Sequence, residues 1–126
     1  MELPDDNPKT RFGVSKPGMA DVPGVALLHL GLAMRDGARK YGRVNYREKD
    51  VTASVYFDAA LRHLWAWWDG EDEAPDSGVH HLGHAMACCA ILLDAMEQGT
   101  QNDDRPSPTG TFSEVARRMT RQFADD

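Results

Sequence analysis

The chain has 126 residues, of which 41% are hydrophobic and 27% charged, and its formal net charge is −6 at pH 7. One domain usually takes roughly 100–200 residues, so this length predicts a single domain. The acidic balance argues against broad binding to a nucleic-acid polymer, which requires a basic surface, and no segment stays apolar for the roughly 18 residues that a membrane span needs. We therefore expect neither a nucleic-acid polymer nor a membrane as a partner.

The two cysteines, Cys88 and Cys89, are neighbours on a predicted helix. Side chains of adjacent helical residues point about 100° apart and do not readily form a disulfide bridge. Reduced thiols suit a reducing compartment, and the acidic, proline-containing start of the chain does not resemble a signal peptide. These features predict a cytoplasmic protein.

Residues 1–21 contain Pro4, Pro8 and Pro17 among few apolar residues, which predicts an extended arm. The basic residues of this arm are ordinary for a solvated segment. For Lys16 a second interpretation stays open, in which the arm folds back and places the ammonium group against a phosphate.

Apolar residues recur at helical spacing through Leu27, Leu30 and Met34, which predicts a helix from about residue 22, capped by Asp21, to about residue 41. His29 is expected to be a core histidine. Residues 42–50 form a polar loop that contains Asn45 and Tyr46. This loop is either a solvated connection or a segment that stacks on a base and reads its edge.

Two strongly apolar helices, residues 53–69 and 78–97, are predicted on either side of an acidic turn. All three tryptophans lie on the first of these helices. Asp58 and Arg62 stand four residues apart there, a spacing that favours an ion pair, and Trp65 lies on the same side. Together with His63 they also border a narrow strip with alanine at its floor, which suits ligand binding, and the two interpretations are compatible.

The second apolar helix is predicted to carry a histidine cluster. His80, His81 and His84 fall within one arc of about 100°, and their spacing allows two imidazoles to bind one metal ion. The acidic turn brings carboxylates, among them Glu71 and Asp72, close to this arc. We expect the chemistry of the protein at this end of the two helices.

After a linker, residues 98–110, a capping box at Thr111–Glu114 predicts a short amphipathic helix. Its apolar stripe, Val115, Met119 and Phe123, is expected to pack on the bundle or on a partner subunit. No strand pattern is present. The expected fold is all-α, about four helices, divided into an arm (1–21), a helical core (22–97) and a C-terminal linker and helix (98–126), and completed by homo-oligomerisation.

Several segments, taken in order, resemble the phage dATP/dGTP diphosphohydrolase domain, a MazZ-type branch of the MazG-like all-α nucleotide pyrophosphohydrolases. The similarity covers roughly residues 16–97 through KPG, VPGVALLHL, GARKYGRVNY, DAALRHLWAWWDGED and DSGVHHLGHA. The resemblance implies hydrolysis of a deoxypurine triphosphate, dGTP or dATP, to the monophosphate and pyrophosphate with a divalent metal. It also implies a place in the nucleotide metabolism of phages with 2-aminoadenine genomes.

One departure from the family concerns the metal. MazG-like enzymes bind magnesium through Glu-Glu-x-x-Glu on one helix and Glu-x-x-Asp on the next, whereas His81 and His84 stand here at the second motif. At the first motif stand Arg62, His63 and Ala66. Either imidazoles and turn carboxylates hold a manganese, zinc or similar ion, or the acids have moved and the histidines bind phosphate or act as bases.

The resulting site hypothesis assigns three roles. The candidate metal ligands are Glu71, Asp72, His81 and His84, and the cofactor is Mg²⁺ or Mn²⁺, with Zn²⁺ as an alternative. The candidate catalytic residues are Asp58, His63, Glu71 and Asp72. The candidate substrate-binding residues are Lys16, Lys40, Asn45, Tyr46, Arg62 and Trp65.

Two alternatives from other functional classes stay open. In the first, the chain is a non-catalytic helical module that binds a metal or a nucleotide. In the second, it is a phage interaction protein whose tryptophans form a subunit interface. Thermal shift with and without a deoxynucleotide separates the second alternative from the others, because an interaction protein should not respond to the nucleotide.

Overall fold

A computed structural model describes residues 2–107 and 109–124, the side chains of 122–124 excepted. This part of the chain is mostly helical, so the predicted all-α class is confirmed. The helices are α1 (Pro8–Gly13), α2 (Gly24–Tyr41), α3 (Asn45–Glu48), α4 (Ala53–Trp68), α5 (His81–Gln98) and α6 (Thr111–Ala124), and the strands are β1 (Val51–Thr52) and β2 (Gln101–Asn102). None of the described helices is both long and apolar enough to cross a membrane.

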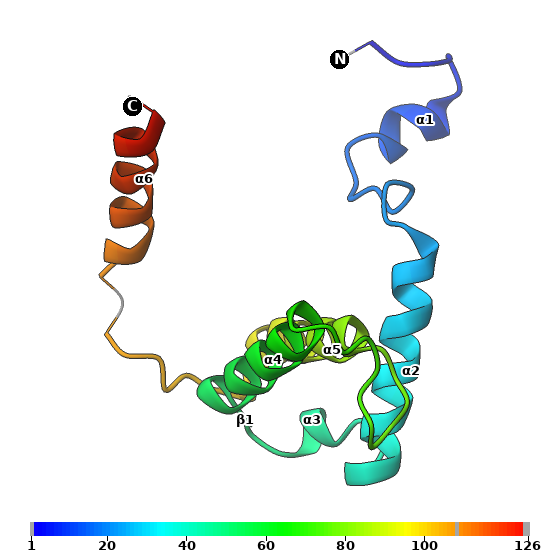
Figure 1. The fold of residues 1–126 in the computed structure, drawn as a ribbon. Coiled ribbons are helices and arrows are strands. Elements are labelled where there is room, and N and C mark those ends of the chain that lie inside the picture. Colours follow the sequence, from blue (N-terminus) through cyan, green and yellow to red (C-terminus); the bar gives the residue numbers. More distant parts are fainter. Residues whose placement is uncertain (1, 108, 125–126) are drawn as a thin grey trace.

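The helices α4 and α5 form an antiparallel hairpin, and α2 crosses α5 (Figure 1). Gly83 on α5 lies at this crossing. A Cβ atom on Gly83 would stand 2.7 Å from the carbonyl oxygen of His29 on α2, closer than any side chain could remain. The missing side chain therefore allows the two helix backbones to approach closely.

The buried core of the described residues is small and consists mostly of alanines. Apart from Val51 and Val79, its hydrophobic members are Ala33, Ala53, Ala60, Ala74, Ala85, Ala87 and Ala95. Many large apolar side chains are exposed instead, on α2, α4 and α6. One copy of the chain thus leaves much of its apolar surface in contact with water.

The segment after α5 is bound to the start of α4. Val51 and Thr52 pair in parallel with Gln101 and Asn102, although the sequence pattern predicts no strand. Both the backbone N–H and the hydroxyl of Ser54 donate to Asp104, the former at 2.8 Å. Thr52 stands at the N-cap of this helix without a side-chain hydrogen bond, and Asp104, fifty residues from Ser54, accepts at the helix N-terminus instead.

Three local features differ from expectation before α4. The arm expected to be extended contains α1, where Asn7 accepts a hydrogen bond from the N–H of Lys9 and proline begins the helix. The N-cap of α2 is Pro23 rather than Asp21. Residues 45–48 of the expected loop form α3.

The two end helices stand apart from the core. In Figure 1, α1 and the first turns of α2 rise on one side of the α4–α5 hairpin, and α6 rises on the other, so that the chain has the outline of a U. Of the stripe predicted on α6, the side chain of Phe123 lies outside the described residues.

Candidate functional site

The acidic turn between α4 and α5 is a short hairpin held by its backbone. The N–H of Glu71 donates to the carbonyl of Ala66 at 2.9 Å, and the N–H of His81 donates to the carbonyl of Asp72 at 2.8 Å. Ala74 is buried beneath the turn. These bonds fix the position of the Glu71 carboxylate beside the start of α5.

Glu71, His81 and His63 form a hydrogen-bonded chain, called the Glu71–His81–His63 chain below. His81 Nε2 lies 2.6 Å from Glu71 Oε1, and His81 Nδ1 lies 2.9 Å from His63 Nδ1. The carboxylate accepts, so His81 Nε2 carries a proton, and in neutral His81 the other nitrogen then accepts from His63 Nδ1–H. This arrangement leaves the lone pair of His63 Nε2 free to take a proton.

His84 lies against this chain. Its ring stacks on His63 with centroids 4.7 Å apart and planes 17° apart, and its Nε2 lies 2.8 Å from the hydroxyl of Ser77. Burial lowers the pKa of His63 to about 4, helped by the neighbouring His84 and His81, and burial also lowers the pKa of His84. Both rings are therefore neutral near pH 7.

His80 does not join the cluster. The helix α5 begins at His81, and His80 is its N-cap, with Nδ1 accepting from the N–H of Leu82 at 3.0 Å. Its ring lies 5.4 Å from that of His29, on another side of the helix. The predicted arc of three histidines is wrong for His80, because the helix starts three residues later than expected.

An ion-pair network joins α2 to the acidic turn. Asp36 is buried and accepts from Arg39 at 2.6 Å and from Lys40 at 3.0 Å, and Lys40 also contacts Asp76 at 2.8 Å. Burial opposes ionisation of Asp36, but the hydrogen bonds from Lys40 and Arg39 prevail and lower its pKa. The bond to Asp76 is the main cause of the raised pKa of Lys40. Lys40 is thus charged and held between two carboxylates.

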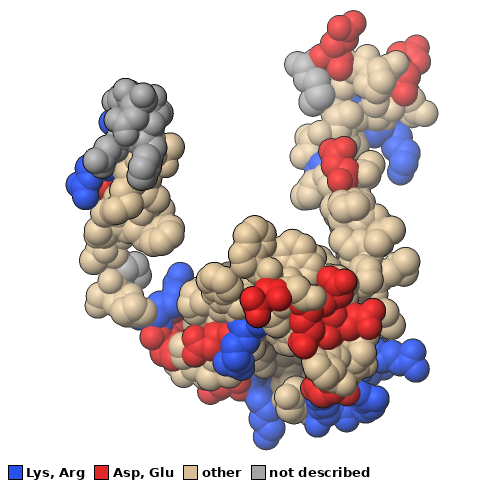
Figure 2. Space-filling model, viewed as in Figure 1, with Lys and Arg blue, Asp and Glu red and all other residues tan. Residues whose placement is uncertain are grey.

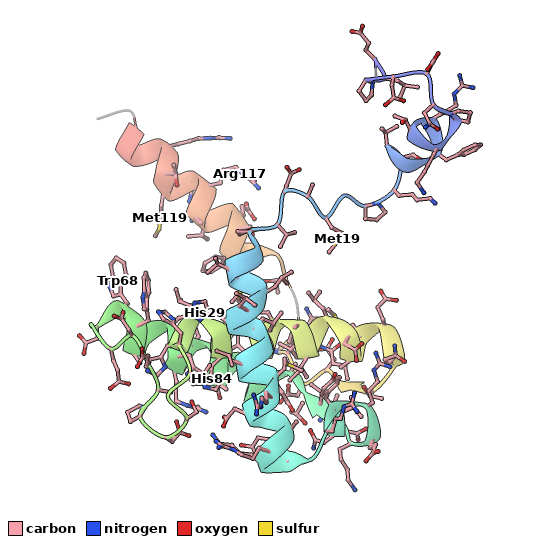
Figure 3. The ribbon with its side chains drawn as sticks, turned by 90° about the vertical axis from the view of Figure 1, so that its right-hand side faces the viewer. Met19, His29, Trp68, His84, Arg117 and Met119 are labelled. Atoms are coloured by element: carbon pink, nitrogen blue, oxygen red, sulfur yellow. The ribbon has the colours of Figure 1, made fainter. Side chains whose placement is uncertain are left out.

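Asp36 and Lys40 border a pocket of about 590 Å³ between α2, the 42–46 segment and α5, called the α2 pocket below. Its polar lining includes Lys40, Asn45, Tyr46 and His84 (Figure 3 shows His84 beside the lower half of α2). Val44, also in the lining, has φ 52°, in the left-handed region that is costly for a β-branched residue. Such a conformation is typical of segments shaped for a function.

The structure brings some of the predicted site residues together and leaves others apart. Lys40, Asn45, Tyr46 and His84 line the α2 pocket, and His63, Glu71 and His81 form the chain beside it. The carboxylate of Asp72 is on the same turn and exposed. The residues that lie away from the pocket lining are Lys16 on the N-terminal arm, Asp58 and Arg62 on the exposed side of α4, and Trp65 in an apolar hollow with Trp67 and Trp68. Among the described ion pairs there is none between Asp58 and Arg62.

The predicted metal ligands do not converge as one set. Within residues 2–107 and 109–124, no three His, Cys, Asp or Glu side chains are placed to hold an ion together. Both ring nitrogens of His81 are engaged by Glu71 and His63, and Nε2 of His84 is engaged by Ser77. The ligand set is therefore still a prediction, and these residues fit hydrogen bonding to one another better than a metal cage.

Asp36 and Tyr56 are not among the site residues predicted from the sequence. The signal for Asp36 was present, because Arg39 and Lys40 follow it at the i+3 and i+4 positions that favour ion pairs on a helix. Tyr56 lines the α2 pocket from α4, and burial raises the pKa of its hydroxyl. Tyr56 reaches this pocket because α4 packs near α2, and no local sequence pattern reveals that packing.

Comparison with protein families gives one match. The family described as dATP/dGTP diphosphohydrolase, N-terminal, matches residues 6–105, which include the α2 pocket and the Glu71–His81–His63 chain but not α6. Comparisons with curated proteins and with solved structures gave no match. Since the match spans most of the chain, this protein belongs to the dATP/dGTP diphosphohydrolase N-terminal family.

Proposed function

We propose that this chain hydrolyses a deoxypurine nucleoside triphosphate, dGTP or dATP, to the monophosphate and pyrophosphate, as part of phage nucleotide metabolism. The observation that carries the proposal is the α2 pocket, where cationic and aromatic side chains meet His84, whose ring stacks on His63. The family match supports the substrate class.

The α2 pocket has room for a nucleotide. Its volume of about 590 Å³ falls in the usual range for small-molecule sites, roughly 300–1,000 Å³. Arg35, Lys40 and Arg43 line it and supply positive charge for the phosphates. Asn45 and Tyr46, on the first turn of α3, supply an amide that can read a base edge and a ring that can stack on the base.

Lys40 has to exchange a partner when the triphosphate binds. It contacts the buried Asp36 and the exposed Asp76, whose side chain is 67% accessible. A phosphate oxygen offers the ammonium group the same kind of charge-assisted bond that Asp76 offers. We infer that the phosphate replaces Asp76, while Asp36 keeps Lys40 in place.

In the proposed reaction, a water oxygen attacks the α-phosphorus and the bond from this phosphorus to the bridging oxygen breaks, so that pyrophosphate leaves. His63 Nε2 takes the proton of the water, and His81 and Glu71 hold the ring in the required tautomer. Because the pKa of His63 is about 4, its ring is neutral and able to accept at pH 7. A divalent ion, Mg²⁺ or Mn²⁺ with Zn²⁺ as an alternative, belongs to the proposal as a companion of the triphosphate, since Mg²⁺ in such sites binds largely through substrate phosphates.

The test is turnover of dGTP, dATP and dCTP by the purified chain with Mg²⁺ or Mn²⁺, followed by chromatography of the products. The proposal expects dGMP or dAMP with pyrophosphate. Replacing Lys40 by Ala should lower kcat/KM by about 100-fold, because a phosphate contact is lost, and Lys49→Ala is the matched control at an exposed position outside the pocket. Release of dGDP and phosphate, or the absence of turnover with every divalent ion, would contradict the proposal.

One observation favours a second candidate, a non-catalytic nucleotide-binding module: no three potential metal ligands converge in the described part of the chain. This candidate expects dGTP to raise the melting temperature through the same pocket without any product. Measuring the thermal shift and the turnover on the same preparation distinguishes the two functions.

A further inference from the structure

A single copy of the chain exposes more surface than a folded monomer of its size. Its accessible surface is 10232 Å² for 14.0 kDa, whereas compact monomers of this mass expose roughly 6,700 Å². The excess, roughly 3,500 Å² per chain, is more than the roughly 1,000–2,500 Å² that each partner contributes to a typical permanent interface. A protein partner packed against the chain would cover part of this surface.

An apolar groove of about 850 Å³ runs between α2, α4 and α5. Val25, Leu30, Leu64, Met86 and Leu93 contribute to its walls. Among the described residues, no Asp, Glu, Lys or Arg lines it. The side of the core between the two arms of the U accordingly shows mostly uncharged side chains in Figure 2.

Helix α6 carries an apolar stripe that matches such a groove. Phe112, Val115 and Met119 follow one another at spacings of three and four residues on one face. The side chains of Phe112 and Met119 are 87% and 55% exposed. Met119 and Arg117 project from different sides of the helix (Figure 3). The helix lies beyond residue 105, so the family match gives it no role.

We propose that α6 of one copy packs its Phe112–Val115–Met119 stripe into the apolar groove of a second copy, and that the exchange is reciprocal. A dimer of this kind would bury part of the excess surface, and a two-fold dimer closes on itself. Charge supports α6 as the occupant of the groove. The polar side of α6 carries Arg117, Arg118 and Arg121, and the turn beside the groove end at His80 carries five carboxylates, Asp69, Glu71, Asp72, Glu73 and Asp76.

The first experiment measures the mass of the full chain by light scattering coupled to size-exclusion chromatography. The wild type should be a dimer, and Met119→Glu should be a monomer, because the carboxylate cannot enter an apolar groove. Ser113→Glu adds the same charge to α6 away from the stripe, and it should remain dimeric. A monomeric wild type, or a dimer that Met119→Glu leaves intact, would overturn the proposal.

The second experiment uses Cys89, which is exposed and lines the groove. Phe112, Val115 and Met119 are each replaced by Cys, and mild oxidation should give a covalent dimer for at least one variant, because a disulfide needs Cα atoms within about 7 Å. Adding Cys89→Ser should abolish this product, and Ser113→Cys should not give it. An intrachain bridge at monomer mass would show that α6 covers its own groove, and no bridge at any position would show that it covers none. Either result overturns the proposal.

Discussion

The two sides of α5 differ in the chemistry they present. One side, with His84, Ala87 and Cys88, faces the α2 pocket, which is rich in cationic and aromatic side chains. The other side, with Met86, Cys89 and Leu93, faces the apolar groove. Adjacent residues on a helix point about 100° apart, so neighbours such as Cys88 and Cys89 end in different environments. One helix thus separates a site suited to a charged ligand from a surface suited to a second protein chain.

The crossing of α2 over α5 borders both the pocket and the groove, so breaking it should have the largest effect. Replacing Gly83 by Ala puts a Cβ atom 2.7 Å from the backbone oxygen of His29, which forces the helices apart. We expect a loss of about 1–3 kcal/mol in the free energy of unfolding, measured by chemical denaturation.

The control for this crossing is Gly31→Ala on α2, where a Cβ would meet no atom within 4 Å. Alanine favours the helix over glycine, so this variant should gain up to about 1 kcal/mol. A Gly83→Ala protein as stable as the wild type would mean that the two helices are not as close as described.

The sequence predicted the elements whose patterns are local. The apolar run of residues 53–69 becomes α4 at Ala53–Trp68, and the pairing of His63 with His81 and His84 follows from two apolar helices that face each other. The periodicity of the apolar residues predicts these features, because it shows where a helix lies and which of its faces is buried.

Long-range partners could not be predicted in the same way. Asp104 caps α4 from fifty residues away, and β1 pairs with a strand beyond α5. Asp76 lies on the acidic turn that the sequence predicts, but its contact with Lys40 depends on how α2 crosses the hairpin. His80 looked like a member of a helical arc, and only the start of α5 decides that its side chain caps the helix instead.

On the pocket side, Glu71→Gln should reduce activity without unfolding the protein. Glutamine keeps the size of the side chain but removes the charge that holds the proton on His81 Nε2. We expect kcat to fall by at least about 10-fold, measured with dGTP across a range of pH.

The matched control is Glu73→Gln, an exposed carboxylate of the same turn, which should leave kcat unchanged. Equal losses in both variants would assign the effect to the charge of the turn in general. Wild-type activity in Glu71→Gln would remove the Glu71–His81–His63 chain from the mechanism.

The smallest expected effect is a decrease in stability at mildly acidic pH. Burial lowers the pKa of His63 from 6.5 to about 4, so below pH 6.5 the unfolded chain binds a proton that the folded chain does not. The contribution of His63 to stability is complete above pH 6.5 and is lost as the pH falls towards 4. The melting temperature should therefore decrease between pH 7 and pH 5, and less so in His63→Gln. Identical curves for the two proteins would contradict the burial of this ring.

The separation of the two sides of α5 can be tested directly with its own cysteines. The rates at which a thiol reagent labels Cys88 and Cys89 are measured by mass spectrometry, with and without a dGTP analogue whose α–β bridge is a methylene group. Burial raises the pKa of Cys88 and should make it the slower thiol from the outset. We predict that the analogue slows Cys88 further and leaves Cys89 unchanged, whereas dilution to monomer speeds Cys89 alone. Protection of Cys89 by the nucleotide, with no change at Cys88, would contradict the assignment of the α2 pocket as the nucleotide site.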